Sequence, residues 1–200
     1  MSRKFADIAF TPNVKKAQED NGSRRSYARL ERREVHSEVL GPSETTFIAE
    51  RDNFYMATVS ETGWPYIQHR GGPPGFVRVL DQTTIGFADF RGNRQYVTVG
   101  NLKANDRVSM IFMDYPNRAR LKIFGRARLI GLDENDILGR LSLPAYKAVV
   151  ERGFLINIEA FDWNCPQHIT PRFTPAEIEK AVAPLHQRIA VLEAELDAKS

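Results

Sequence analysis

The sequence contains one cysteine, Cys165, four scattered histidines, and no apolar stretch long enough to cross a bilayer. One cysteine excludes an intrachain disulfide and a cysteine-cluster metal site. No two histidines have the spacing of metal ligands on a helix, so we expect no bound metal. A membrane-spanning helix needs about 20 apolar residues, and the polar N-terminus does not resemble a signal peptide. We therefore expect a cytoplasmic protein with no membrane partner.

The sequence also has little excess charge. It has 28 Lys and Arg residues against 25 Asp and Glu residues, and the net charge of +3 is too small to indicate a nucleic-acid partner. A length of 200 residues suits one domain with extensions at its ends. The apolar fraction of 42% is typical of a globular core, so no disulfide or metal is needed to hold the fold.

Residues 1–42 are polar and form a predicted N-terminal arm. Thr11 followed by Pro12 predicts a helix with an N-cap and a proline at its first position. Residues 24–34 carry five arginines against two glutamates. Such a segment suits a solvated arm or a helix lying over a partner; a nucleic-acid patch is the other interpretation, although exposed aromatic residues are not interleaved with the arginines.

Residues 43–172 have the pattern of a mainly β domain. Period-two alternation, broken by turn residues, predicts strands at 54–60, 64–70, 76–80, 84–88, 106–114, 118–130 and 154–162. Helices are predicted at 43–51 and 93–103, with two short ones between 133 and 151 separated by Pro144. Many short antiparallel strands with few helices between them predict a β-barrel with flanking helices.

Residues 173–200 predict a C-terminal amphipathic helix, beginning at Pro175. Its apolar residues are spaced 4, 3, 4, 3, 4, as in a coiled-coil heptad: Ile178, Val182, Leu185, Ile189, Leu192 and Leu196. Pro184 lies inside this helix and is expected to bend or restart it. The apolar stripe can pack along the chain's own barrel or against a partner subunit, and the sequence does not distinguish these alternatives.

One predicted strand, 118–130, carries cations on one face. Arg120, Lys122, Arg126 and Arg128 alternate with apolar residues that fit a barrel interior. A stripe of one sign suggests an anionic ligand or an acidic partner surface, and a solvated outer face is the alternative.

Two further segments could contact a ligand. Gln68 and Arg70 share a strand face that ends at two glycines, where a ligand could approach the backbone closely, although a simple turn explains the glycines as well. A predicted helix start at Asn93, followed by Arg94, would offer amide groups and a positive charge to a phosphate, and the alternative is an ordinary cap with a surface arginine.

Together these segments resemble the pyridoxamine-phosphate-oxidase-like FMN-binding split-barrel family over residues 44–172. The resemblance places Gln68-His69-Arg70 at an FMN-contacting strand end and Phe87-Ala88-Asp89-Phe90 at an aromatic–small–acidic–aromatic run. Asn93-Arg94-Gln95 takes the place of a Ser-Arg-Lys triplet that grips the phosphate, and Arg120 that of a polar flavin contact. Trp163 and Arg172, with Gln167 between them, nearly match the spacing of a late tryptophan and arginine that reach the flavin in the true oxidases.

The resemblance implies a split barrel that binds FMN and a homodimer with FMN at its interface. It implies an FMN-dependent oxidoreductase acting on an unidentified small molecule; the alternative is a non-catalytic flavin- or anion-binding module that acts through a partner. The sequence does not exclude a deazaflavin or haem as the ligand in place of FMN. Gln95 replaces the family's second basic residue, and the Arg-Leu-His-Asp-Arg segment that holds pyridoxal phosphate is missing, so the chain departs from the true oxidase. His168 is the one candidate acid or base in this set, with a structural hydrogen-bonding role as the alternative.

Overall fold

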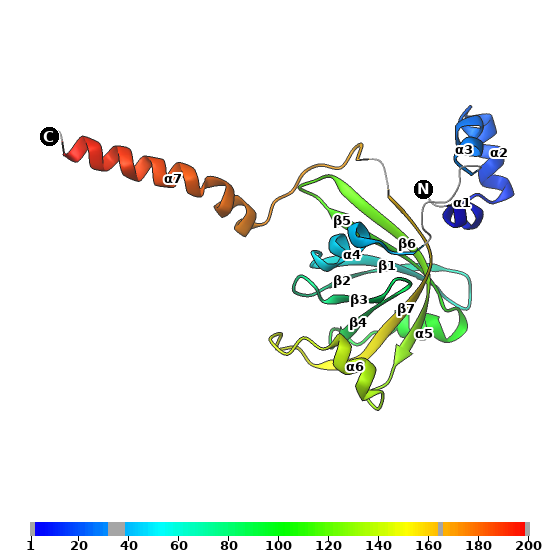
Figure 1. Ribbon diagram of the computed structural model, residues 1–200. Helices are drawn as coiled ribbons and strands as arrows, with labels where there is room; N and C mark the ends of the chain where they lie inside the picture. Colours follow the sequence, from blue (N-terminus) through cyan, green and yellow to red (C-terminus); the bar gives the residue numbers. More distant parts are fainter. Residues whose placement is uncertain (1–2, 32–38, 164–165, 199–200) are drawn as a thin grey trace.

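The computed structural model describes residues 3–31, 39–163 and 166–198, which form one curved antiparallel sheet with helices around it (Figure 1). The strands are β1 (Asn53–Val59), β2 (Pro65–Gly71), β3 (Val77–Asp81), β4 (Thr84–Phe90), β5 (Arg107–Asp114), β6 (Ala119–Ile130) and β7 (Val150–Trp163). The helices are α1 (Arg3–Ala9), α2 (Pro12–Asp20), α3 (Arg24–Glu31), α4 (Pro42–Ala49), α5 (Val97–Ala104), α6 (Asn135–Leu141) and α7 (Pro175–Asp197). The expected split-barrel fold is confirmed.

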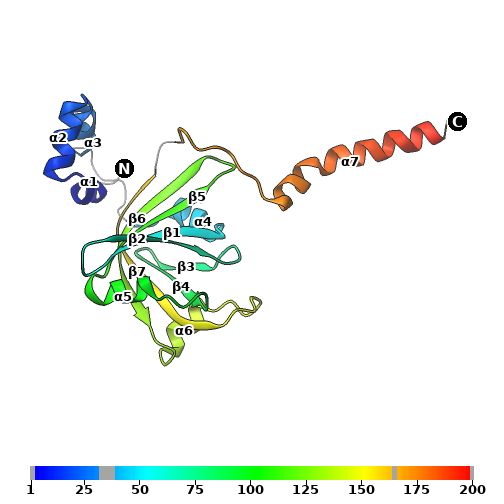
Figure 2. The same cartoon turned by 180° about the vertical axis from the view of Figure 1, so that it is seen from behind.

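The strand order makes the barrel an open one. The strands pair in the order β2-β1-β5-β6-β7-β4-β3, so β2 and β3 follow each other in the chain but lie at opposite edges of the sheet. The sheet curls until these edges approach, as Figures 1 and 2 show from opposite sides. Side chains near the edges can therefore meet across the opening.

Phenylalanines from several strands fill the inside of the barrel. The ring of Phe54 on β1 lies 5.7 Å from that of Phe76, and 5.1 Å from the rings of both Phe87 and Phe112. Phe87 in turn stacks on Phe154 with 4.9 Å between ring centroids. Because Phe54 on β1 and Phe87 on β4 come from strands far apart in the sheet order, their packing helps to hold the sheet in its curled form.

The long strand β6 shows how sequence sets the two faces. Of its alternating apolar residues, Leu121 and Ile123 are fully buried and Ala127 is nearly so, as predicted, while Leu129 is only partly buried. At Gly125 the pairing with β7 shifts by one residue, and a Cβ there would lie 2.8 Å from the carbonyl oxygen of Asn157. Only glycine lets the two backbones approach this closely.

The predicted helix starting at Thr11 and Pro12 is confirmed as α2, in which Thr11 Oγ1 accepts a hydrogen bond from the amide of Val14. One predicted helix starts later than expected, and one of two short predicted helices does not form. The helix expected from Asn93 begins only at Val97, because Arg94 and Tyr96 have left-handed backbone angles (φ 61° and 54°) that a right-handed helix excludes. Only α6 forms between residues 133 and 151; residues 142–149 include no helix, and Pro144 lies in this turn-rich segment.

The two ends of the chain lie differently against the barrel. Helix α1 packs on the outside of the sheet, where Phe5 stacks on Phe124 at 4.8 Å between centroids. Helix α7 instead points away from the barrel, and none of its 23 residues is buried (Figures 1 and 2). Of the two alternatives for the α7 stripe, the structure does not show packing along the chain's own barrel, and the helix continues through Pro184 rather than restarting there.

We predict that Phe54→Ala destabilises the protein by about 3–5 kcal/mol, because it removes a fully buried ring that contacts three others and leaves a cavity. Chemical denaturation would measure the free energy of unfolding. Ile67→Ala, on the exposed face of β2, is the matched control and should change stability by less than about 0.5 kcal/mol. Equal losses in the two variants would contradict the role given to the aromatic core.

Candidate cofactor-binding site

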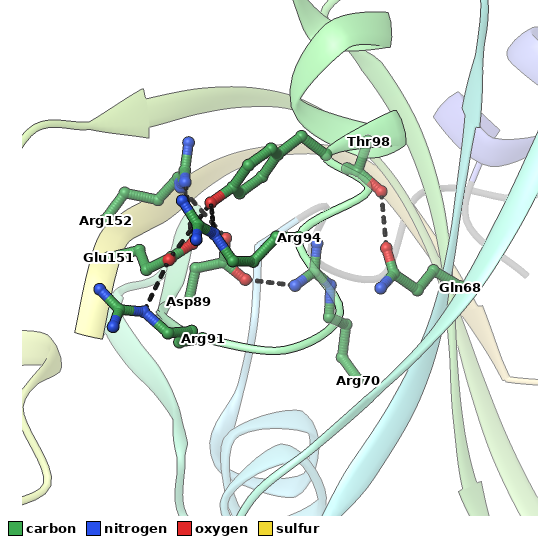
Figure 3. Close-up of polar contacts among 9 residues, drawn as sticks. Gln68, Arg70, Asp89, Arg91, Arg94, Thr98, Glu151 and Arg152 are labelled. Carbon is green, nitrogen blue, oxygen red and sulfur yellow. Dashed lines mark hydrogen bonds and ion pairs between the residues drawn. The ribbon is translucent and has the colours of Figure 1, made fainter. Parts of the chain in front are cut away.

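An ion pair crosses the opening of the barrel. Arg70 on edge strand β2 donates from Nη1 to Oδ1 of Asp89 on β4, and Arg152 Nε on β7 lies 3.3 Å from the other oxygen, Oδ2 (Figure 3). The Asp89 side chain is only 8% exposed. Burial raises the pKa of Asp89 above that of an exposed aspartate, while the charges of Arg70 and Arg152 oppose this rise. The pair ties β2 to strands from the other end of the sheet order.

A second carboxylate, Glu151, lies beside the first. Its oxygens accept from Arg91 Nε at 3.0 Å, from the Tyr96 hydroxyl at 3.3 Å and from Arg152 Nη2 at 3.1 Å. Desolvation works to raise the pKa of Glu151, but the hydrogen bonds from Arg91, Tyr96 and Arg152 outweigh it and hold the pKa below its usual value. The carboxylate therefore stays ionised and fixes the surrounding arginines.

Arg94 lies in the loop between β4 and α5, at the mouth of this cluster. Its Nε donates to the Tyr96 hydroxyl at 3.0 Å, and the amide of Gln95 donates to Asn93 Oδ1 at 3.2 Å. At Gly92 a Cβ would meet no atom within 4 Å, so the loop backbone borders open space. The loop thus presents a guanidinium and accessible backbone, as a phosphate site requires, although it is not the helix N-terminus that the sequence suggested.

Two adjoining hollows, each of about 190 Å³, open beside these residues. Gln68, Arg70, Asp89, Phe90 and Gly92 line both of them. Gln68 is held in place because its side-chain oxygen accepts a hydrogen bond from Thr98 Oγ1 on α5 at 3.0 Å. Ligand sites for molecules of drug size usually exceed about 300 Å³, so this wall can enclose only part of a molecule as large as FMN.

The charges of this cluster, which we call the arginine pocket, fit a phosphate dianion. The pocket consists of Arg70, Arg91, Arg94 and Arg152 with Asp89 and Glu151, so two positive charges are in excess. Within the described residues, Arg70 Nε is buried without a hydrogen-bond partner. Arginine suits phosphate because its planar fork matches two oxygens at once, and an unpartnered buried donor is costly unless a ligand or water meets it.

Three more residues that the resemblance singled out, His69, Phe87 and Ala88, line the second hollow. Phe87 is 1% exposed and packs in the barrel core, and Ala88 is also buried. The guanidinium of Arg70 sits 5.9 Å from the Phe87 ring, so Phe87 supports the arginine as well as the core. Phe90 is half-buried, borders both hollows and packs edge-on against Tyr146. His69 is exposed on the opposite face of β2 from Gln68, with its ring 5.4 Å from that of Tyr55.

The late segment lies far from the arginine pocket within one chain. Trp163 ends β7, twelve residues beyond Glu151 in the same strand, which corresponds to about 40 Å. Its indole donates to Glu44 Oε1 at 2.7 Å and packs against Phe47. Gln167 and His168 are exposed in the segment that follows.

Arg172 lies further along, with its guanidinium 4.9 Å from the ring centroid of Tyr115. Burial raises the pKa of Tyr115, and neighbouring Tyr55 raises it further, while Arg172 opposes the rise. The chain alone therefore does not bring Trp163, Gln167 or Arg172 to the pocket that holds Arg94.

The cationic face of β6 is largely neutralised by neighbouring carboxylates. Ion pairs of 2.8–3.1 Å join Lys122 to Asp162, Arg126 to Asp106 and Glu159, and Arg128 to Glu134. Arg120 is half-buried on the same face and also has a partner. Of the two interpretations of this stripe, the geometry favours an ion-paired outer surface over an anion site.

Sequence reasoning missed Glu151, Arg152, Arg91, Tyr96 and Thr98. Glu151 and Arg152 begin β7, and they meet β4 only because Asp89 pairs with Arg152 in the sheet register. No local motif marks them, since their partners lie about 60 residues away in the sequence. The adjacent charges Glu151-Arg152 at the start of an apolar strand were the one available signal.

The described residues contain no cluster of three or more His, Cys, Asp or Glu residues arranged to hold a metal ion. None of the helices in the same part of the chain is long and apolar enough to cross a membrane.

Comparison with known families matches residues 42–153, more than half of the chain, to the family model for pyridoxamine 5'-phosphate oxidase. The chain belongs to the pyridoxamine 5'-phosphate oxidase-like family. The matched range contains the whole arginine pocket and ends just after Arg152. No curated protein matches the chain.

Several solved structures have a similar fold at low identity. One is a Clostridium acetobutylicum protein of the pyridoxinephosphate oxidase family, related to general stress protein 26 of B. subtilis, with 16% identity, a TM-score of 0.44, and coverage of 68% of this chain and 94% of that one. HupZ of group A Streptococcus has 16% identity and a TM-score of 0.47, covering 67% and 100%. An F420 reductase has 20% identity and a TM-score of 0.41, covering 61% and 98%. The family assignment rests on the family model and not on these structures.

We predict that Arg152→Ala lowers the free energy of unfolding by about 3 kcal/mol, because it removes a cation paired to both Asp89 and Glu151 in a largely buried cluster. Thermal or urea unfolding measures the loss. Arg94→Ala is the matched control: its side chain is exposed at the pocket mouth, so stability should hardly change. Equal free energies of unfolding for the two variants would contradict the structural role given to Arg152.

Proposed function

We propose that this chain binds FMN with its phosphate in the arginine pocket and acts as a flavin-dependent oxidoreductase on a small molecule. The excess of two positive charges around Gly92 and Arg94 is the observation that carries the proposal, because it matches the charge of a phosphate monoester. Membership of the pyridoxamine 5'-phosphate oxidase-like family supports it.

The chain's own residues would bind and orient the cofactor. Arg94 and the Gly92–Asn93 backbone would hold the phosphate, and the Nε of Arg70 would donate to a ligand atom beside it. Gln68, fixed by Thr98, would hydrogen-bond a polar edge of the ligand. When bound, FMN supplies the hydride or electron transfer itself. Asp89 and Glu151 are each engaged by arginines, so they act as positioning groups rather than as general bases.

Oxidation of pyridoxamine phosphate is not part of this proposal. The chain lacks the Arg-Leu-His-Asp-Arg segment of the true oxidases, and the segment after β7 leads instead into the projecting helix α7. We propose that the substrate is another small molecule.

The pocket should bind FMN more tightly than riboflavin, since only FMN carries the phosphate that the arginines attract. Arg94→Ala should weaken FMN affinity roughly 30-fold, the usual effect of losing a charge-assisted hydrogen bond, and leave riboflavin affinity unchanged. Flavin fluorescence titration of the apo-protein measures both.

Arg128→Ala is the matched control for this experiment. Arg128 is an exposed arginine on β6, outside the pocket, and forms an ion pair with Glu134. Equal affinity for FMN and riboflavin would reject the phosphate site. The absorption spectrum of the protein as purified separates FMN from a deazaflavin or haem.

We further propose that FMN lies at the interface of a homodimer. A wall of two small hollows leaves most of a flavin ring exposed, and a twofold partner would complete both sites at once. The segment that carries Trp163, Gln167 and Arg172 cannot reach the pocket of its own chain, about 40 Å along the strand, but a partner's copy could.

A mixture of two variants tests this shared site. Arg94→Ala and Arg172→Ala should each lower FMN affinity in the homodimer. A hybrid dimer of one subunit of each kind contains one site with both arginines and one with neither, so mixing should restore tight binding to about half of the sites in each hybrid. Flavin titration before and after exchange of subunits measures this gain, and no gain on mixing would mean that each chain binds FMN alone.

Adding NADH or NADPH to the FMN-loaded protein distinguishes a catalytic protein from one that only binds flavin. Rapid bleaching of the flavin absorbance supports the oxidoreductase. A flavin that stays oxidised favours the alternative, in which the protein is a non-catalytic module acting through a partner.

A further inference from the structure

Helix α7 is capped at its start, but its apolar stripe packs against no other element of the described structure. Its start is fixed by a capping box, in which Thr174 Oγ1 accepts from the amide of Glu177 and the Glu177 carboxylate accepts from the amide of Thr174 at 2.7 Å. The helix projects from the barrel (Figures 1 and 2), and apolar side chains such as Leu185 and Leu196 are more than 60% exposed. Most of the stability of a helix in a protein comes from packing of its apolar face, and the apolar stripe of α7 has no such contact within the described residues.

The stripe, which we call the α7 seam, has the composition of a two-stranded coiled coil. Its first core position, heptad position a, holds Val182, Ile189 and Leu196, and its second, position d, holds Ile178, Leu185 and Leu192. Val182 and Ile189 at a, with Leu185 and Leu192 at d, follow the pattern that favours parallel dimers over trimers and tetramers. Leu196 at a and Ile178 at d depart from this pattern at the two ends of the seam. Pro184 occupies position c, outside the seam, so its ring does not obstruct the apolar contact.

We propose that the α7 seam pairs in parallel with α7 of a second copy of this chain. The charges beside the seam select this orientation. In a parallel pair, Arg188 at position g faces Glu193 of the partner subunit at position e, and the twofold axis repeats this attraction. An antiparallel pair would instead place Arg188 against its own copy and Glu179 against Glu193 of the partner subunit, and both contacts repel.

The pairing is independent of the flavin site. The seam lies wholly in residues 178–196, outside the residues that line the arginine pocket, and needs no ligand. The two proposals can therefore fail separately, and the experiment is done on the full chain without added flavin.

Disulfide crosslinking of the full chain tests the orientation. In a Cys165→Ser background, Ile178→Cys places a thiol at the start of the seam. Parallel helices bring the two thiols together, whereas antiparallel helices hold them about 27 Å apart, the rise of 18 helical residues. Mild oxidation should give crosslinked dimer with Ile178→Cys and not with Gln187→Cys, the matched control on the outer side of the helix. Failure of Ile178→Cys to crosslink overturns the proposal.

Charge reversal supplies an independent test in the same Ile178→Cys background. Arg188→Glu and Glu193→Arg should each slow crosslinking about five- to tenfold, because each turns two attractions into two repulsions, and the double variant should restore the rate. In an antiparallel pair Glu193→Arg would attract Glu179 of the partner subunit, so tighter dimerisation of that variant, seen by light scattering, would also overturn the parallel arrangement.

Discussion

The pocket depends on the ion pair between Arg70 and Asp89, which crosses the opening of a barrel that the phenylalanine core holds curled. The ion pair joins an edge strand, β2, to β4, a strand near the opposite edge. The two strands are not paired through their backbones, so side chains bridge the opening between them. A buried pair of this kind costs desolvation, and the second guanidinium, from Arg152, helps to offset that cost. The same arginines that join the edges also give the pocket its positive charge, so the contacts of the fold and the charge of the pocket come from one set of atoms.

This sharing explains why the arginines of the pocket are not equivalent. Arg152 is enclosed by two carboxylates and by the ring of Tyr96, 4.9 Å from its guanidinium, and it belongs to the scaffold. Arg94 stands at the mouth, bonded only through Nε to a tyrosine hydroxyl in the described structure. Arg152 therefore contributes positive potential from inside the cluster, whereas the guanidinium of Arg94 is exposed at the mouth of the pocket.

The sequence predicted the strands well because a period of two with turn residues is a local signal. The apolar face of β6, with Leu121 and Ile123 inside, followed directly from it. Arg94 was singled out from a predicted helix start and again from the family resemblance, and it lines a hollow in the structure. Its local geometry was not predicted, since left-handed angles at Arg94 and Tyr96 replace the expected helix start. Glu151 was missed because strand register, which brings distant residues together, leaves no trace in local sequence.

The left-handed backbone at Arg94 has a cost in folding stability. A side chain with a Cβ is strained at φ 61°, whereas glycine adopts that angle freely. A chain with glycine at this position would fold more favourably and would lose the guanidinium at the pocket mouth. The folded protein therefore keeps a small conformational penalty next to its charged cluster, and a bound anion is the means by which that penalty would be recovered.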